Sequence, residues 1–161
     1  MEKVTIRVLR ANDAEAVATL SASLGYPASA GEVQSRIELL ADSNDRMAFA
    51  AILQDAVVGW IDAAVERHLQ SEPVVVIGGL IVRDDMRGKR IGQQLCHAVE
   101  QWAVQIGIAA VRVRSQLKRA DAHRFYLRDG YTQMKISAVF EKHVLRQPSF
   151  TESPSHSSTA D

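Results

Sequence analysis

A basic, glycine-containing turn between a predicted strand and a predicted helix has the composition of an anion-binding site. The turn in the stretch LIVRDDMRGKRIGQQL carries Arg87, Lys89 and Arg90, and a helical pattern follows it at once. Unpaired backbone N–H groups and the positive end of the helix dipole favour an anion there, and Gly88 and Gly92 let the anion approach the main chain. The stretch matches neither the G-x-G-x-x-G nor the Walker pattern. A solvated basic turn is the alternative, and the residues alone leave both interpretations open.

Two glycines interrupt the apolar strand that leads into this turn. The segment VVVIGGLIV, from Val74 to Val82, has no alternation of polar and apolar residues, so it predicts an interior strand that is buried on both faces. Gly78 and Gly79 bring no side chain to the packing, and such residues often mark a bulge or a close approach to the backbone. We therefore expect a ligand to lie near the main chain at this point.

Composition and charge exclude several classes of protein. The 161 residues, 47% of them hydrophobic, allow one domain with a continuous core. Lys plus Arg and Asp plus Glu both total 19, so there is no net positive field to attract nucleic acid or an anionic membrane, and we expect neither as a partner. The lone Cys96 and a start, MEKVTIRVLR, without the long apolar core of a signal peptide favour a cytoplasmic location, and no apolar run reaches the roughly 18 residues that a membrane helix needs. Because the histidines are scattered, no metal is expected.

The residue patterns predict one mixed α/β domain over residues 1–146 and a low-complexity tail over 147–161. Asn12 or Asp13 is expected to cap the first helix, and Ser29 with Glu32 has the spacing of a capping box before the second. The expected elements are a strand over 4–9, helices over 14–24 and from 30 on, strands over 47–53, 57–67 and 74–82, a long helix from 91, a strand over 111–115, a helix over 120–129 and further strands from 131 on.

Two segments resemble the GCN5-related N-acetyltransferases. The signature of that family is Arg or Gln, two residues, Gly, one residue, then Gly or Ala at the head of a long helix; the residues from Arg87 to Gly92 match it, with Arg90 in place of the middle Gly. The run SQLKRADAHRFYLRDGY resembles the second acetyl-CoA segment of the family, with Lys118 where many relatives have Asn. The resemblance extends from VTIRVLR to VFEKHVL. It implies the acyl-CoA N-acyltransferase fold, β-α-α-β-β-β-α-β-α-β-β, with the fourth and fifth strands splayed apart.

The resemblance also implies acetyl-CoA as the cosubstrate and a direct attack of an amine through a tetrahedral intermediate. Leu80 and Val82, with Ile81 between them, would offer backbone hydrogen bonds to the pantetheine arm, and the Leu80 N–H would stabilise the oxyanion. Tyr126 stands at the place of the family's general acid, and we expect it to face the cleft while Phe125 points inside. The residues that would hold the pyrophosphate are Arg87, Gly88, Lys89, Arg90, Ile91, Gly92 and Gln93.

The sequence says less about the residues that would bind and deprotonate the acceptor amine. Many relatives carry an acidic residue on the fourth strand where this chain has Gly78 and Gly79, so a direct carboxylate base is not expected there. Glu66 and His68, at the end of the third strand, are candidates that would take the proton of the amine through water or recognise the substrate. A histidine at the place of His68 and the passage KR-DAHRFYLR-GY are most similar to aminoalkylphosphonate N-acetyltransferases.

We therefore expect an N-acetyltransferase that acts on a primary amine, with a small molecule such as an aminoalkylphosphonate or an aminoglycoside as the acceptor. The alternatives are a protein or peptide acetyltransferase acting on lysine or the N-terminus, and a non-catalytic CoA-binding regulatory module. Because relatives are frequently dimers through their C-terminal strands, a homodimer is also expected. The apolar residues that would form such a strand here are Val139, Phe140, Val144 and Leu145.

Overall fold

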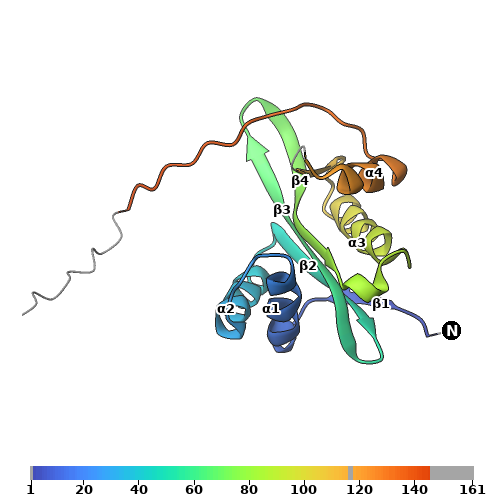
Figure 1. Cartoon of the computed structure of the whole chain (residues 1–161). Coiled ribbons are helices and arrows are strands. Elements are labelled where there is room, and N and C mark those ends of the chain that lie inside the picture. The colour runs from blue at the N-terminus through green and yellow to red at the C-terminus, as the bar shows by residue number, and fades with distance from the viewer. Residues whose placement is uncertain (1, 116–117, 146–161) are drawn as a thin grey trace, which may run out of the picture.

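The structure, a computed structural model of the chain, describes residues 2–115 and 118–145, so the predicted tail over 147–161 lies outside the described residues. One five-stranded sheet runs through the molecule, with α1 and α2 on one face and α3 and α4 on the other (Figure 1). The elements are β1 (Thr5–Val8), a 3-10 helix (Ala11–Asp13), α1 (Ala14–Ser23), α2 (Ala30–Ala41), β2 (Arg46–Leu53), β3 (Ala56–His68), β4 (Ser71–Val82), a 3-10 helix (Asp84–Met86), α3 (Ile91–Gln105), β5 (Val111–Val113) and α4 (Ala120–Arg128).

The strands lie in the sheet in chain order, from β1 to β5. Neighbours from β1 to β4 are antiparallel, and β5 is parallel to β4. Gln54 and Asp55 join β2 to β3 with φ values of 48° and 62°, as a tight two-residue hairpin turn requires. The predicted mixed α/β class and the predicted order of elements up to α4 are thus confirmed. β4 is interior, as expected, and both its faces are buried from Val74 to Ile77.

Two hydrophobic cores hold the helices on the sheet. Under α3, Ile61 of β3 packs with Leu95 and Val99, and all three side chains are fully buried. Under α1 and α2, the core contains Val17 and Ile37. Removing an aliphatic side chain of this size from water contributes about 1.5–3 kcal/mol to stability. The sheet therefore presents the end of β4 and the start of α3 in a fixed relative position.

The predicted capping box of α2 is confirmed. The Glu32 N–H donates to Ser29 Oγ at 3.1 Å, and the Ser29 N–H donates to Glu32 Oε2 at 2.8 Å. These bonds satisfy two backbone donors at a helix end where intrahelical partners are lacking.

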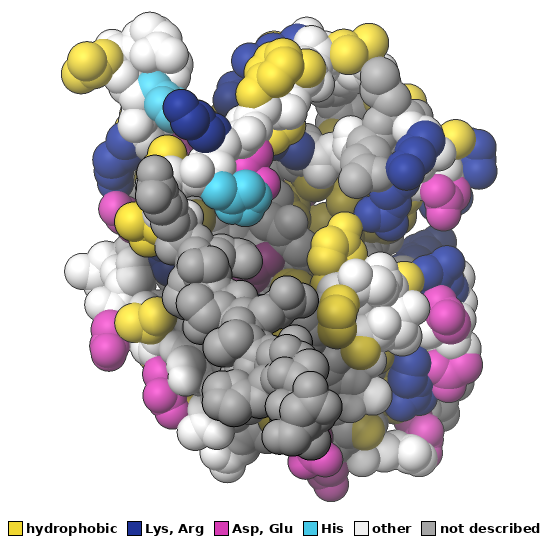
Figure 2. Space-filling view, turned by 60° about the vertical axis from the view of Figure 1, so that its left-hand side comes forward, with side chains coloured by type: hydrophobic (Ala, Val, Ile, Leu, Met, Phe, Trp, Pro, Cys, Tyr) yellow, Lys and Arg dark blue, Asp and Glu magenta, His cyan; other side chains and the backbone are white. Residues whose placement is uncertain are grey.

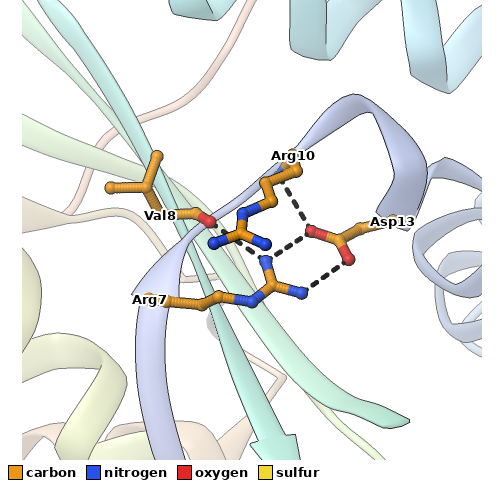
Figure 3. A network of polar contacts seen from close by, with 4 residues as sticks. All are labelled: Arg7, Val8, Arg10 and Asp13. Atoms are coloured by element: carbon orange, nitrogen blue, oxygen red, sulfur yellow. Dashed lines mark hydrogen bonds and ion pairs between the residues drawn. The ribbon is translucent and has the colours of Figure 1, made fainter. Parts of the chain in front are cut away.

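The start of α1 differs from the prediction, because the Asp13 side chain does not cap that helix. Its carboxylate instead accepts two bonds from the Arg7 guanidinium, at 2.8 and 2.9 Å, and one from the Arg10 N–H at 2.8 Å (Figure 3). Asp13 is buried, and the Arg7 guanidinium lowers its pKa. A charged partner on β1 thus outcompetes the helix amides for this carboxylate and fastens β1 to the start of α1.

The strands expected after Tyr131 are not formed. Residues 132–145 have no regular secondary structure, and the side chains of Met134, Ile136 and Phe140 are 78%, 66% and 93% exposed. Exposed hydrophobic side chains also stand along the top of the space-filling view (Figure 2). A strand needs a neighbour to pair its backbone groups, and in the described part of one chain no strand pairs with this segment. In the ranges described, none of the helices combines the length and hydropathy that crossing a bilayer would need.

Candidate functional site

β5 is short and pairs with only part of β4. Their parallel pairing joins Val75–Ile77 to Val111–Val113 and stops there. On that side of β4, no described strand pairs with Gly78–Val82. Because β5 itself ends at Val113, this part of the β4 edge is left open without a diverging fifth strand, and the expected splay stays a prediction.

The register of β3 and β4 determines which backbone groups face this opening. The Arg83 N–H donates to the Val58 carbonyl at 2.8 Å, which makes these two residues a hydrogen-bonded pair. Hydrogen-bonded and non-hydrogen-bonded pairs alternate along an antiparallel ladder, and the register here is regular back to Gly79. Leu80 and Val82 therefore direct their N–H and C=O groups away from β3 and into the opening.

The predicted anion-binding turn has unpaired backbone donors. Among the residues that the structure describes, the N–H groups from Gly88 to Gln93 donate no hydrogen bond. Gly88 and Arg90 both have positive φ values, 77° and 60°, so the chain bends tightly into α3. The Arg87 guanidinium is held by Asp84 at 3.0 Å, whereas the Arg90 side chain is exposed. A row of free donors at the positive end of a helix fits a phosphate group.

A hollow of about 360 Å³ opens beside this turn and runs along α3. It is lined by Arg90, Gln93, Gln94, His97, Glu100 and Asp129. An anion on the turn would therefore have room for a bulky substituent next to it.

α4 packs directly on the start of α3. A Cβ atom at Gly92 would lie 3.2 Å from Cζ of Phe125, so a larger residue here would press on the Phe125 ring. Phe125 and Tyr126 are both partly buried, and their rings meet edge to face with centroids 5.2 Å apart. The expectation that Phe125 points inside while Tyr126 faces the cleft stays a prediction, because the two side chains are buried to a similar degree. Burial raises the pKa of Tyr126 to about 12, and the nearby Cys96 adds to this effect.

Cys96 and Tyr131 are neighbours of Tyr126. The Tyr126 and Tyr131 rings lie 5.7 Å apart, and the Tyr131 hydroxyl donates to Glu100 Oε1 at 3.1 Å. Cys96 is fully buried, and burial raises the pKa of its thiol to about 12, so it stays protonated and unreactive.

The structure groups Glu66 with His68 but separates both from Leu80. Glu66 accepts two bonds from the Arg114 guanidinium, each of 2.9 Å, and His68 Nε2 lies 3.4 Å from Glu66 Oε2. The Arg114 guanidinium lowers the pKa of Glu66. Leu80 faces Ile61, which is five residues before Glu66 on β3 and hence roughly 16 Å from it along the strand.

Asp62 is a charged residue near the glycine pair that the sequence analysis did not single out. Asp62 faces Gly79 and Ala63 faces Ile77, so Gly78 is an extra residue in the ladder and forms the predicted bulge. A Cβ atom at Gly78 or Gly79 would lie 3.1 or 3.2 Å from Asp62 Oδ1, so the two glycines leave room for this carboxylate. Burial raises the pKa of Asp62, and the Gly79 N–H and Arg46 act in the opposite direction. The only signal in the sequence is one acidic residue within a strand of mostly apolar residues.

Comparisons with known proteins identify the family and the fold. Residues 14–131 match the acetyltransferase (GNAT) family. The aminoalkylphosphonate N-acetyltransferase of Salmonella typhimurium (strain LT2) is 40% identical over 84 residues, which are 52% of this chain and 54% of that protein, so the chain spans about half the length of this relative.

Two solved structures share the fold. An aminoglycoside N-acetyltransferase in complex with CoA has a TM-score of 0.80 and 18% identity over 88% of this chain and 96% of that one. An aminoglycoside antibiotic 6'-N-acetyltransferase from Acinetobacter baumannii has a TM-score of 0.76 and 18% identity over 88% and 99% of the two chains. With a family match over most of the sequence and a matching fold, the chain belongs to the acetyltransferase (GNAT) family.

Proposed function

We propose that the protein transfers the acetyl group of acetyl-CoA to a primary amine of a small molecule. The observation that carries this proposal is the row of unpaired N–H groups from Gly88 to Gln93, placed at the end of a strand whose own backbone is open at Leu80 and Val82. Acetyl-CoA would supply an acyl group activated as a thioester. The chain would supply hydrogen-bond donors for the phosphates of CoA, an open strand edge for the pantetheine arm, and a proton for the departing sulfur.

Binding would use the main chain more than the side chains. The residues proposed to hold the pyrophosphate are Arg87, Gly88, Lys89, Arg90, Ile91, Gly92 and Gln93. Leu80 and Val82, on either side of the buried Ile81, would pair with the pantetheine arm as a neighbouring strand pairs with its partner. Gly92 fits this arrangement because it has no side chain between α3 and Phe125.

Two groups would stabilise charge as the amine attacks the acyl carbon. The Leu80 N–H would donate to the acyl oxygen, where negative charge develops. Tyr126, whose pKa is raised to about 12, stays protonated at neutral pH and would donate its proton to the departing sulfur.

The proposed acceptor is a small amine of the aminoalkylphosphonate or aminoglycoside kind. Support comes from the relative that acts on aminoalkylphosphonates and from the two aminoglycoside enzymes with the same fold. Glu66 and His68, held beside Arg114 roughly 16 Å from the Leu80 level, would contact the distant end of a long acceptor of the aminoglycoside kind, and a short aminoalkylphosphonate would not reach them.

We also propose that the protein is a homodimer. Every second residue from Met134 to Phe140 is apolar, as in a strand with one buried face, yet the side chains are exposed in the single chain. Pairing of this segment with a second copy would cover them. A cytoplasmic location, expected from the single cysteine, stays a prediction.

The test is a panel of amines incubated with acetyl-CoA while released thiol is measured. Release that depends on a small amine supports the proposal, and release only with lysine peptides or protein N-termini would support a protein acetyltransferase instead. CoA binding by calorimetry without turnover of any amine would indicate a non-catalytic binding module.

A further inference from the structure

The carboxylate of Asp62 occupies a distinctive position next to the open part of β4. Ile61 faces Leu80 across the ladder, so Asp62 is one residue further along β3, just as Gly79 is one residue before Leu80 on β4. Its oxygen atoms lie against the space over Gly78 and Gly79. From Gly78 to Val82 the β4 sequence holds no ionisable side chain, and Asp62 provides one from the neighbouring strand.

Trp60 lies on the same face of β3 as Asp62 and closes the space from the other end. A Cβ atom at Gly79 would lie 2.8 Å from Cη2 of the Trp60 ring, so the ring and the carboxylate both adjoin Gly79. Trp60 Nε1 is buried and has no hydrogen-bond partner among the described residues. A buried donor without a partner is unfavourable, and an acceptor atom of a ligand or a water molecule at this place would satisfy it. A carboxylate beside an aromatic ring is a suitable environment for an ammonium group.

We propose that Asp62 is the general base that binds the ammonium group of the acceptor and takes its proton. This inference rests on the proposed acetyltransferase function. One N–H bond of the ammonium group breaks and its proton passes to an Asp62 oxygen. The nitrogen lone pair then forms the C–N bond to the acyl carbon, the C–S bond breaks, and the sulfur takes a proton from Tyr126. The nitrogen of the new amide then loses its second N–H proton, which restores Tyr126, and Asp62 releases the first proton to solvent.

The charges around Asp62 favour this role. Among the described residues, Arg46 on β2 is the charged side chain that shifts the pKa of Asp62, and it acts against the larger effect of burial. β4 contributes the uncharged Gly78 and Gly79 at this level, and Glu66 is four residues away along β3, roughly 13 Å. A carboxylate that is a stronger base than an ordinary Asp removes a proton more readily. Its negative charge also attracts a cationic acceptor.

The experiment compares Asp62→Asn with the wild type over a range of pH. If Asp62 is the base, a plot of kcat against pH should have an ascending limb, in which kcat rises as Asp62 loses its proton at its own pKa. Its loss should lower kcat at neutral pH by roughly 10²–10⁴-fold and move the limb up to the pKa of the free acceptor amine. Calorimetric affinity for CoA should be unchanged, because the Gly88–Gln93 donors are untouched. Asp45→Asn, which removes an exposed carboxylate paired with Arg67 just before β2, is the matched control and should behave as the wild type does.

A second measurement does not depend on turnover. Carbon-13 NMR of the enzyme without CoA, with the Asp62 signal assigned by its loss in Asp62→Asn, should give a carboxyl pKa above that of an ordinary aspartate. If Asp62→Asn fails to fold, Gly78→Ala replaces it, because the new Cβ presses on the carboxylate at 3.1 Å without removing its charge. That variant should lower kcat and keep the ascending limb.

The outcomes are distinct. An Asp62→Asn enzyme with wild-type kcat at all pH values, a raised KM alone, or an ordinary pKa in the NMR titration would overturn the assignment while the acetyltransferase function stands. Absence of turnover by the wild type with every amine would overturn the proposed function and this inference together.

Discussion

Arg90 holds the same left-handed backbone conformation as Gly88, two residues before it, with φ values of 60° and 77°. Residues with a Cβ atom pay about 1–2 kcal/mol for this conformation. The side chain of Arg90 is exposed beside the free N–H groups of the turn, where a cation favours a bound phosphate. The chain thus keeps the turn geometry that a glycine would give and adds a charge.

Replacing Arg90 with Gly should separate these two effects. We expect the free energy of unfolding to rise by about 1 kcal/mol, because the strained backbone is relieved. The Kd for CoA should rise several-fold, because one cation is lost while the N–H groups stay in place. Thermal denaturation and calorimetry measure the two quantities, and a less stable variant with unchanged affinity would contradict this account.

Gly88→Glu should abolish measurable CoA binding, because it places a carboxylate among the donors of the turn. Gly107→Glu is the matched control: Gly107 follows the other end of α3, has the same φ of 77°, and likewise has no atom within 4 Å of an added Cβ. Both variants carry the same backbone strain and the same charge. Calorimetry should therefore find wild-type affinity in the control alone, and equal affinities in the two variants would rule out the turn as the phosphate site.

Tyr126→Phe should lower kcat by roughly 10²–10⁴-fold, as expected for the loss of a general acid, and leave CoA affinity unchanged. Because the pKa of Tyr126 is raised to about 12, the wild type should show no loss of rate through phenol ionisation up to about pH 10. Tyr131→Phe is the control, since it removes a neighbouring hydroxyl that donates to Glu100. Full turnover by Tyr126→Phe would disprove the role of the acid.

Asp13→Asn should lower the free energy of unfolding by about 2 kcal/mol at pH 7, because the charge-assisted bonds to Arg7 are lost. The pKa of Asp13 is lower in the folded chain than in the unfolded one. Its contribution is therefore fully present above the unfolded pKa of about 3.9 and is lost as the pH falls through the folded pKa. Denaturant titrations at several pH values should show the difference between wild type and variant shrinking below about pH 4; a constant difference would argue against it.

Replacing Ile136 and Phe140 together with Ser should convert the proposed dimer into a monomer, since both apolar side chains belong to the exposed segment after α4. Val104→Ser removes an apolar side chain of similar exposure, 77%, from the outer face of α3 and should have no effect. Light scattering after size-exclusion chromatography measures the mass. A wild-type monomer would refute the dimer itself.

Local sequence signals predicted most of the fold. The capping box at Ser29, the apolar and non-alternating run of β4 and the helical spacing of α3 each act within a few residues, and each element lies where expected. The Asp13 cap failed because its partner, Arg7, comes from a different element. The strands after Tyr131 failed because a strand depends on a neighbour that local patterns cannot provide.

The candidate site was predictable where it uses the backbone. Gly88 revealed the turn because few other residues adopt its φ of 77°, and Gly78 revealed the bulge because the missing side chain leaves room for Asp62. Asp62 was not recognised, since its importance depends on the register of β3 against β4, including the extra residue Gly78. A shift of one residue would place its side chain on the opposite face of the sheet.

The burial of Cys96 means that the reactivity of its thiol can be used to detect local unfolding around α3. Because the only cysteine is fully enclosed and its thiol resists ionisation, a colorimetric sulfhydryl reagent added during turnover would register product and leave the folded enzyme unlabelled. The rate at which Cys96 itself is labelled would then measure local unfolding of α3 from the sheet. A single reagent could therefore follow both catalysis and local unfolding.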